Sequence, residues 1–259
     1  MEKTFKLLEV SIQSSFIILL MIFPLNQLHS KEKCPIGFIQ VPINKLNNNF
    51  VKNSFCVMKH EAKKYKNKIS TDIKMPPWAM ITQANAKKVC QGMGEGYQLI
   101  SNREWMAIAR NIESQNENWT GKKVGVGCLK KGNVGSKQPC QNVSSGYLSV
   151  RDKEVDFGPL RNPLAQLKLS NNNEIWDMSG NLWEWIDWER KGEYANSIKI
   201  NNNIGLKNSW KKSERNVVHR GRSWNDGTYA SIYTFLLFTS DNVKDTDVGF
   251  RCTFSFAKK

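Results

Sequence analysis

The sequence contains few groups that bind transition metals or act as bases, since only three of its 259 residues are histidine. Its six cysteines never stand in Cys-x-x-Cys spacing, which argues against a zinc site or a thioredoxin-like redox centre. The apolar run at 16–23 is too short to cross a membrane, because a spanning helix needs roughly 20 apolar residues. The lysines are scattered and form no long basic tract, so the sequence predicts no specific nucleic-acid site.

The composition is typical of a folded domain. Hydrophobic residues make up 40% of the chain and aromatic residues 10%, which suits a protein with a core. The length allows one large domain or two small ones. The formal net charge of +15 favours acidic partners such as anionic glycans or lipid surfaces, although scattered lysines are also typical of a solvated surface.

Residues 1–30 have the pattern of a signal peptide. Lys3 and Lys6 precede the apolar run, and polar residues lead to Ser30. Cleavage near Ser30 would leave one domain at 31–259 and export it to the periplasm, the cell surface or the medium. No membrane span is then expected, and an uncleaved anchor is the alternative. All six cysteines follow Ser30, and their even number predicts disulfides, whose most economical pairing is Cys34–Cys56, Cys128–Cys140 and Cys90–Cys252.

The stretch Ile175–Trp188, IWDMSGNLWEWIDW, holds four of the nine tryptophans. Trp183 and Trp185 are two apart, so on a strand they point the same way and bury their rings together. The step at 179–181, Ser-Gly-Asn, predicts a turn between two short extended pieces. Charged residues beside so much apolar surface need partners, and this applies to Asp177, Glu184 and Asp187.

Other elements follow from periodicity and capping signals. A hairpin is predicted from 38–41 and 55–58. One helix begins after Thr82, and a second begins at the capping box of Ser101 and Glu104, with a short strand at 97–100 between them. The region 118–173 has little periodicity and is predicted as a long loop, although it could also hold a missed element. Strands are predicted at 217–224 and 249–256, and in the latter Phe250, Cys252, Phe254 and Phe256 alternate onto one face.

Four of these blocks resemble the formylglycine-generating enzyme (sulfatase-modifying factor) domain family. The stretch from Asp177 to Trp185 resembles its D-x-x-G-N-x-W-E-W signature, and RSWNDG followed by VGFRC resembles its ending. The resemblance implies an α+β, C-type-lectin-like fold with twisted antiparallel sheets, two helices and long irregular loops. It also implies that Cys90 pairs with Cys252, as cysteines in the matching places do in that family.

The chain departs from the enzyme where the resemblance places a copper site. The family's enzyme binds copper through two thiolates, and the matching positions here are Asp226 and Ser231. Hydroxyl and carboxylate groups do not replace thiolates for copper(I). The iron-dependent relatives use histidines from an extra domain that this chain lacks, so neither copper nor iron is expected. The alternative is a sulfatase-modifying-type oxidase with unrecognised metal chemistry.

A binding module agrees better with these residues. The ending also resembles the variable proteins of diversity-generating retroelements, in which side chains between the two terminal motifs form a ligand-binding face. The resemblance predicts an exported, non-catalytic binding or adhesion protein whose partner is a macromolecule or a glycan. The other interpretation is that Tyr229, Tyr233 and Phe235 are core residues of a strand. The predicted ligand-binding residues are Asn225, Asp226, Tyr229, Tyr233, Leu236 and Phe238.

A structural calcium ion is predicted in the Trp-rich stretch. The resemblance implies it, because the family's enzyme binds calcium through the same motif positions. Calcium takes 6–8 oxygen ligands, which alternate carbonyls between two acids can supply. Pairing of the two acids with Arg or backbone donors is the alternative. The predicted ligands are the carboxylates of Asp177 and Glu184 and the carbonyls of Met178, Gly180 and Leu182.

Overall fold

A computed structural model describes residues 33–134, 163–188, 217–226, 230–238 and 242–256 of the chain. The predicted signal peptide, residues 1–30, lies outside this part of the chain, and so does Cys140. The predicted cleavage and the predicted Cys128–Cys140 bridge therefore stay predictions.

The first sheet contains the predicted N-terminal hairpin. Its four strands, all antiparallel, lie in the order β1-β2-β12-β5, and the hairpin register pairs Phe38 with Met58. The Cys34–Cys56 disulfide is formed and fixes the start of the described chain to β2. The bounds of the strands are β1 Phe38–Val41, β2 Phe55–Met58, β5 Tyr97–Leu99 and β12 Cys252–Phe254.

Both predicted helices are present with the predicted caps. Helix α1, Gln83–Gln91, begins after Thr82, whose side chain accepts a hydrogen bond from the backbone N–H of Asn85. Helix α2, Asn102–Glu113, begins at Ser101, and the reciprocal bonds between Ser101 and Glu104 form the capping box. The Cys90–Cys252 disulfide joins α1 to β12 across 162 residues, as the family resemblance implied.

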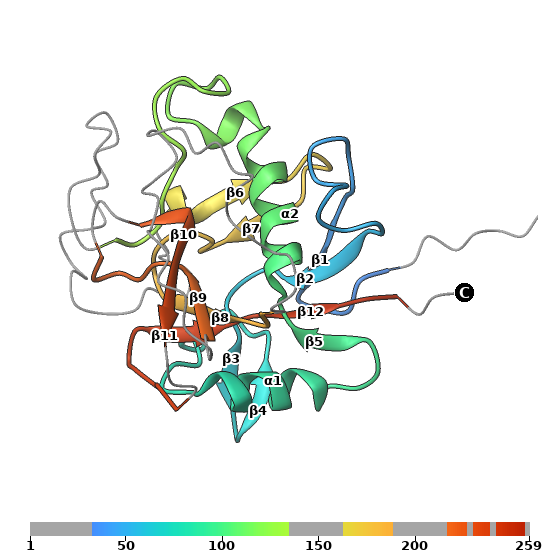
Figure 1. The fold of residues 1–259 in the computed structure, drawn as a ribbon, viewed down its shortest axis with the longest axis vertical. Helices are drawn as coiled ribbons and strands as arrows, with labels where there is room; N and C mark the ends of the chain where they lie inside the picture. Colours follow the sequence, from blue (N-terminus) through green and yellow to red (C-terminus); the bar gives the residue numbers. More distant parts are fainter. Residues whose placement is uncertain (1–32, 135–162, 189–216, 227–229, 239–241, 257–259) are drawn as a thin grey trace, which may run out of the picture. The chain divides into compact units, whose positions relative to one another are not determined.

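The second sheet carries the second half of the Trp-rich stretch, strand β8, in its middle. Its order is β10-β9-β8-β11, with β11 parallel to β8 and the other pairs antiparallel. Two small hairpins, β3–β4 and β6–β7, and two 3-10 turns, η1 Asn116–Asn118 and η2 Pro163–Ala165, complete the elements (Figure 1). The strands are β3 Lys63–Tyr65, β4 Lys68–Ser70, β6 Gln166–Lys168, β7 Glu174–Trp176, β8 Trp183–Ile186, β9 Val217–Gly221, β10 Ser231–Phe238 and β11 Val248–Phe250.

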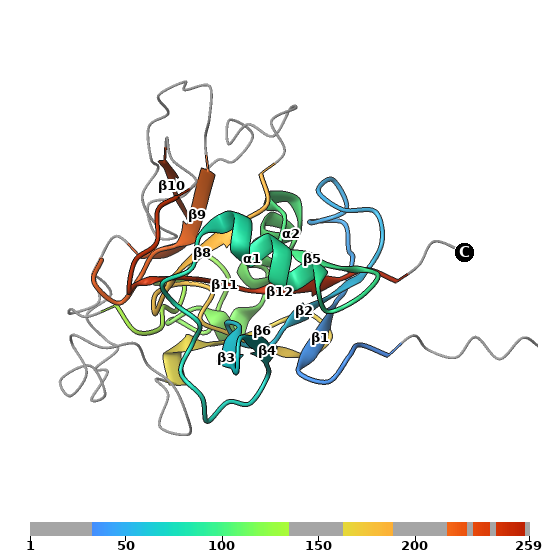
Figure 2. The ribbon, with the colours of Figure 1, turned by 90° about the horizontal axis from the view of Figure 1, so that it is seen from below.

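Two sequence predictions need correction. The region predicted as loop at 118–173 contains β6, which pairs with β7 in antiparallel register. The single strand predicted at 249–256 is two strands, because the pairing changes from β8 to β2 and β5 at Arg251. β11 and β12 follow one another in an almost continuous line from the second sheet to the first (Figure 2). Phe250 and Cys252 nevertheless lie in one buried cluster, and Phe254 and Phe256 pack against it, so these four side chains share one side as predicted.

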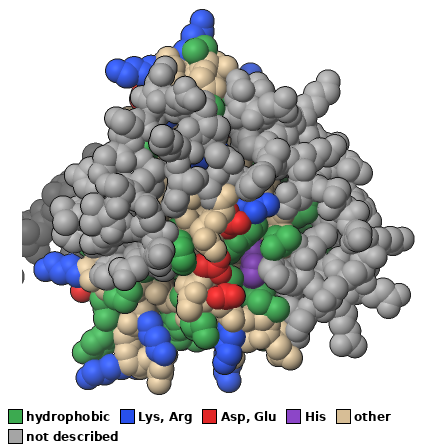
Figure 3. Space-filling model, turned by 90° about the vertical axis from the view of Figure 1, so that its left-hand side faces the viewer, with side chains coloured by type: hydrophobic (Ala, Val, Ile, Leu, Met, Phe, Trp, Pro, Cys, Tyr) green, Lys and Arg blue, Asp and Glu red, His purple; other side chains and the backbone are tan. Residues whose placement is uncertain are grey.

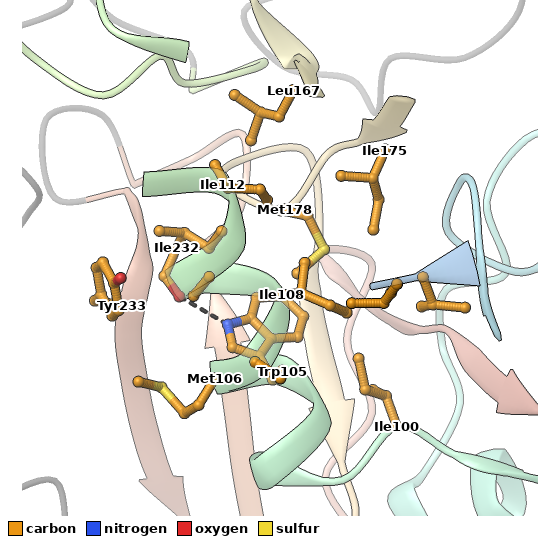
Figure 4. Packing of buried hydrophobic residues seen from close by; sticks show 14 of the residues in the cluster. Ile100, Trp105, Met106, Ile108, Ile112, Leu167, Ile175, Met178, Ile232 and Tyr233 are labelled. Atoms are coloured by element: carbon orange, nitrogen blue, oxygen red, sulfur yellow. Dashed lines mark hydrogen bonds between the residues drawn. The ribbon is translucent and has the colours of Figure 1, made fainter. Parts of the chain in front are cut away.

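The core lies around α2. The buried side chains of this helix meet those of β6, β7, β10 and the segment after β7 (Figure 4). Trp105 is fully buried, and its indole N–H donates to the carbonyl of Ile232 at 2.7 Å. Burying a residue of this size contributes roughly 2–3 kcal/mol, provided that its polar atom keeps a partner. The helix therefore joins the parts of the fold that hold the Trp-rich stretch.

Candidate functional site

The Trp-rich stretch is built around a buried histidine. Trp185 pairs with His219 across β8 and β9, and their ring centroids are 3.6 Å apart. Trp183, two residues earlier, has its ring centroid 5.9 Å from the same imidazole. The two tryptophans thus point to one side, as the spacing predicted. His219 has no exposed surface, and burial lowers its pKa to about 3, so the imidazole is neutral at physiological pH.

Glu184 and Arg251 form a fully buried ion pair beneath these rings. Arg251 Nε donates to Glu184 Oε2 at 2.6 Å, and Arg251 Nη2 donates to Glu184 Oε1 at 2.5 Å. The guanidinium also donates to the carbonyls of Met58 and Trp176 at 3.2 and 3.0 Å. Burial raises the pKa of Glu184 and Arg251 opposes that rise. Arg251, the residue between β11 and β12, therefore neutralises the charge of Glu184.

Glu61 is a site residue that sequence reasoning missed. Its carboxylate is buried and accepts from the side-chain amide of Asn181 at 2.6 Å and from the backbone N–H of Leu182 at 3.1 Å. The available signal was an acidic residue three positions after an apolar strand, at the end of FCVMKHE. Gly180 in the same turn has φ +90°, and a Cβ there would lie 2.4 Å from the carbonyl oxygen of Asn133. A glycine is thus required at this point.

The predicted calcium ligands are close in the chain and buried. Asp177 and Glu184 are 1% and 0% exposed. The carbonyls of Ser179 and Asn181 accept hydrogen bonds from the backbone N–H groups of Gly132 and Trp224, respectively. These hydrogen-bonded carbonyls alternate along the chain with the three carbonyls predicted to bind calcium. No group of three or more His, Cys, Asp or Glu suited to a metal occurs in the described ranges, so carbonyls would have to complete the site.

The donor types suit calcium, but for Glu184 the structure shows the alternative, which is pairing with an arginine, Arg251. All the predicted donors are oxygens, which a hard cation prefers. A carboxylate has about four lone-pair positions, and Arg251 uses two of those on Glu184. The charge on Glu184 is already balanced by Arg251, so the second acid, Asp177, would supply the charge for the ion.

Asp226 and Ser231 are both engaged by neighbouring groups. Asp226 Oδ1 accepts from Arg222 Nη1 at 2.7 Å, and Asp226 Oδ2 accepts from the backbone N–H and hydroxyl of Ser223 at 2.9 and 2.8 Å. Ser231 is buried opposite Gly221, and its hydroxyl accepts from the backbone N–H of Tyr233 at 3.2 Å. These are the two positions that the resemblance assigns to copper thiolates.

Asp226 also lies beside a second acid. The hydroxyl of Ser223 is 2.8 Å from Asp226 Oδ2 and 2.9 Å from Asp247 Oδ2, so one hydroxyl joins two half-buried carboxylates. Burial raises the pKa of Asp247, and the nearby charges of Asp245 and Asp226 add to this rise. Acidic side chains gather near the middle of the face on the β9–β11 side of the molecule (Figure 3).

The predicted ligand-binding residues do not all lie on the surface. Asn225 is exposed, Asp226 is half-buried, and Leu236 is 37% exposed on β10. Tyr229 and the side chain of Phe238 lie outside the described residues.

The prediction that Tyr233 binds ligand at the surface is wrong, because its side chain is buried. It is 1% exposed, and its hydroxyl donates to Glu113 Oε2 at 2.6 Å while the Arg110 guanidinium lies 5.3 Å from its ring. Burial raises its pKa well above the usual value. Phe235 is 4% exposed, so the core interpretation holds for these two residues.

The two four-stranded sheets, which are antiparallel except for the β8–β11 pair, the two capped helices and the buried WEW strand define a C-type-lectin-like domain of the α+β class. The chain belongs to the sulfatase-modifying factor enzyme 1-like domain family, whose model matches residues 39–255. A search of curated proteins found no match.

Three solved structures are similar in fold. Treponema denticola variable protein 1 has 13% identity and a TM-score of 0.45, with 78% of this chain and 84% of that chain covered. CarF has 13% identity and a TM-score of 0.42, with 86% and 99% covered. PvdO from Pseudomonas aeruginosa has 11% identity and a TM-score of 0.40, with 85% and 90% covered.

Proposed function

We propose that the chain is an exported, non-catalytic binding or adhesion module on the sulfatase-modifying-factor scaffold. The observation that carries this proposal is the environment of Asp226 and Ser231. Both stand at positions where copper chemistry needs thiolates, and both use their side-chain oxygens in hydrogen bonds within the protein. An oxidase of the copper type therefore has no ligand pair here, whereas a binding role needs only the scaffold and an exposed face.

The proposed ligand face is the turn after β9 together with the exposed part of β10. Asn225 and Leu236 present an amide and an aliphatic group to solvent, and Asp226 is held by Arg222. Behind them, Arg220 donates to the side chain of Asn102 at the start of α2, so the scaffold is fixed. Exposed side chains on a rigid frame lose little conformational entropy when they bind. The partner that this face fits is a macromolecule or a glycan.

Export is supported by the cysteines. The Cys34–Cys56 and Cys90–Cys252 bridges persist only in an oxidising compartment. Among the described residues, no helix has the length and apolar character needed to span a membrane.

A structural calcium ion in the Trp-rich stretch is part of the same proposal. Asp177, Glu184 and the carbonyls of Met178, Gly180 and Leu182 would hold it, and its role would be to fix the turn that precedes β8. It would supply charge neutralisation for Asp177, a carboxylate with almost no exposure to solvent.

Two assays test the proposal together. Copper-loaded protein incubated with a C-x-P-x-R peptide should leave the cysteine unconverted, and mass spectrometry should show no copper-dependent mass loss. Arrays of glycans and proteins, probed with the purified protein, should give a signal that Asn225→Arg and Leu236→Asp abolish. Leu46→Asp is the matched control, because Leu46 is 55% exposed on a different loop. Peptide conversion, or equal loss of array binding in the control, would refute the proposed function.

A further inference from the structure

The β3–β4 hairpin is a basic surface feature that the proposed ligand face does not include. Its tip, residues 64–68, reads KYKNK, and all five residues are exposed. Lys66 and Asn67 have φ values of 47° and 62°, which is the backbone of a tight two-residue hairpin turn. Tyr65 pairs with Lys68 across that turn. The tip is thus a short, ordered projection at the lower edge of the molecule (Figure 1).

The exposed lysines of the hairpin stand in a segment that has almost no acids to balance them. Lys59 pairs with Glu174 at 3.3 Å, and Lys87 pairs with Asp187 at 2.7 Å. Among the described ion pairs, none involves the exposed lysines of the hairpin or of the segment after it, which are Lys64, Lys66, Lys68 and Lys74. The single acid between residues 62 and 80 is Asp72, whose carboxylate accepts from the backbone N–H of Lys74.

Apolar groups are exposed among these charges. Tyr65 is 53% exposed, and Ile73, in the segment that follows β4, is 43% exposed. The ammonium of Lys64 lies 5.3 Å from the ring centroid of Trp78, and that of Lys66 lies 5.4 Å from the ring centroid of Tyr65. Basic and hydrophobic side chains alternate along the lower edge of the molecule in Figure 3. Lysine with exposed aromatic and aliphatic groups is the composition of surfaces that lie at a membrane interface.

We propose that this basic–aromatic hairpin tip, defined as residues 64–68 with Ile73 and Lys74, docks the protein on an anionic lipid surface. The lysines would contact anionic headgroups, and Tyr65 and Ile73 would enter the headgroup region. An anionic glycan would satisfy the lysines equally well but would leave Ile73 in water. The exposed apolar side chains therefore favour the lipid surface over the polysaccharide. Each lysine at such a surface contributes about a five-fold gain in affinity.

Co-sedimentation with vesicles tests the proposal on the purified full chain. Vesicles of phosphatidylcholine with phosphatidylglycerol should bind the protein at about 0.1 M salt, and vesicles of phosphatidylcholine alone should not. The variant Lys64→Glu/Lys66→Glu/Lys68→Glu should lose at least about 100-fold in affinity. The matched control Lys45→Glu/Lys52→Glu/Lys123→Glu makes the same change of charge at exposed lysines elsewhere and should lose less than about five-fold. Tyr65→Ala should weaken binding further at high salt, where the apolar contact carries more of it.

Several outcomes would overturn the proposal. One is the absence of vesicle binding by the wild type, and another is equal loss in both triple variants, which would show that net charge alone acts. A third is binding to dextran sulfate that exceeds vesicle binding and does not depend on Tyr65, which would assign the surface to anionic glycans. If the hairpin variant unfolds below the assay temperature, the neutral set Lys64→Gln/Lys66→Gln/Lys68→Gln replaces it, with an expected loss of at least about 25-fold.

Discussion

Two regions of this molecule, the strand β8 and the turn after β9, resemble the same family but differ in how far their side chains match its motifs. Around β8, the Trp-rich stretch is held by Glu61, Arg251 and the partners of His219, all of them buried. Around the turn after β9, Asp226 and Ser231 stand at the positions that the resemblance assigns to copper thiolates, and both are hydrogen-bonded within the protein. The β8 region is under structural constraint, because each of its polar groups would cost free energy if left without a partner. The turn region can change its chemistry while the frame stays folded.

Removal of the Cys90–Cys252 disulfide, which joins α1 to β12, should have the largest effect on stability. Replacing Cys90 and Cys252 together by alanine should lower the free energy of unfolding by about 4–5 kcal/mol, because the bridge closes a long loop of 162 residues. The Cys34–Cys56 bridge spans only 22 residues, and its removal should cost about 3 kcal/mol. Urea unfolding of both double variants measures the two costs. Equal costs would show that loop length does not determine the contribution.

The buried ion pair should come next. Arg251→Met removes the guanidinium and leaves the Glu184 carboxylate buried without its cationic partner. This should lower the free energy of unfolding by about 3–5 kcal/mol. Lys59→Met is the control, since the Lys59–Glu174 pair is about one-third exposed and should contribute less than about 1 kcal/mol. Thermal unfolding of the two variants under the same conditions gives the contrast. A small effect for Arg251→Met would mean that Glu184 is held by something other than this pair.

Much of the fold was predictable because its signals are local. The capping box at Ser101, the cap at Thr82 and the shared side of Trp183 and Trp185 depend on neighbouring residues, and all are confirmed. Strand β6 was missed because a three-residue strand has no measurable periodicity. The break at Arg251 was missed because it depends on a pairing change between two sheets and on Glu184, 67 residues away.

The candidate site was less predictable than the fold. The sequence left open whether Tyr233 faces a ligand or whether Tyr233 and Phe235 are core residues, and both are buried in the core cluster that contains side chains of α2. Glu61 was missed because its partners, Asn181 and Leu182, are about 120 residues away in the sequence. The calcium ion and the ligand face depend on groups outside the chain, so they stay proposals.

Calcium sharpens the comparison further. We expect the midpoint of thermal unfolding to be higher in millimolar calcium than in chelator. At a calcium concentration of 100 times the dissociation constant, the gain in the free energy of unfolding is about 2.7 kcal/mol. Asp177→Ala should remove the calcium-dependent part, while Asp226→Ala, in the other region, should keep it. Coinciding midpoints with and without calcium in the wild type would exclude the ion from the β8 region.

The smallest expected effect comes from Asp247 in the turn region. Burial raises its pKa above the usual value of 3.8, with repulsion from Asp245 and Asp226 in the same direction. A carboxyl with a raised folded pKa binds its proton more tightly when folded, so its contribution to stability is greatest at low pH and is lost as pH rises through that pKa. Asp247→Asn cannot titrate and keeps a group that can donate to Ser223 Oγ.

The variant's stability relative to the wild type should therefore increase from pH 3 toward neutrality, by about 0.5 kcal/mol or less. The measurement is urea unfolding at four or five pH values, with Asp72→Asn, an exposed acid outside the turn, as the matched control. A difference that stays flat with pH, or that falls as pH rises, would mean that Ser223 favours the ionised form of Asp247. Asp247 would then be ionised and accept the hydroxyl proton of Ser223, while Asp226 would keep Arg222 and the backbone N–H of Ser223 as its donors.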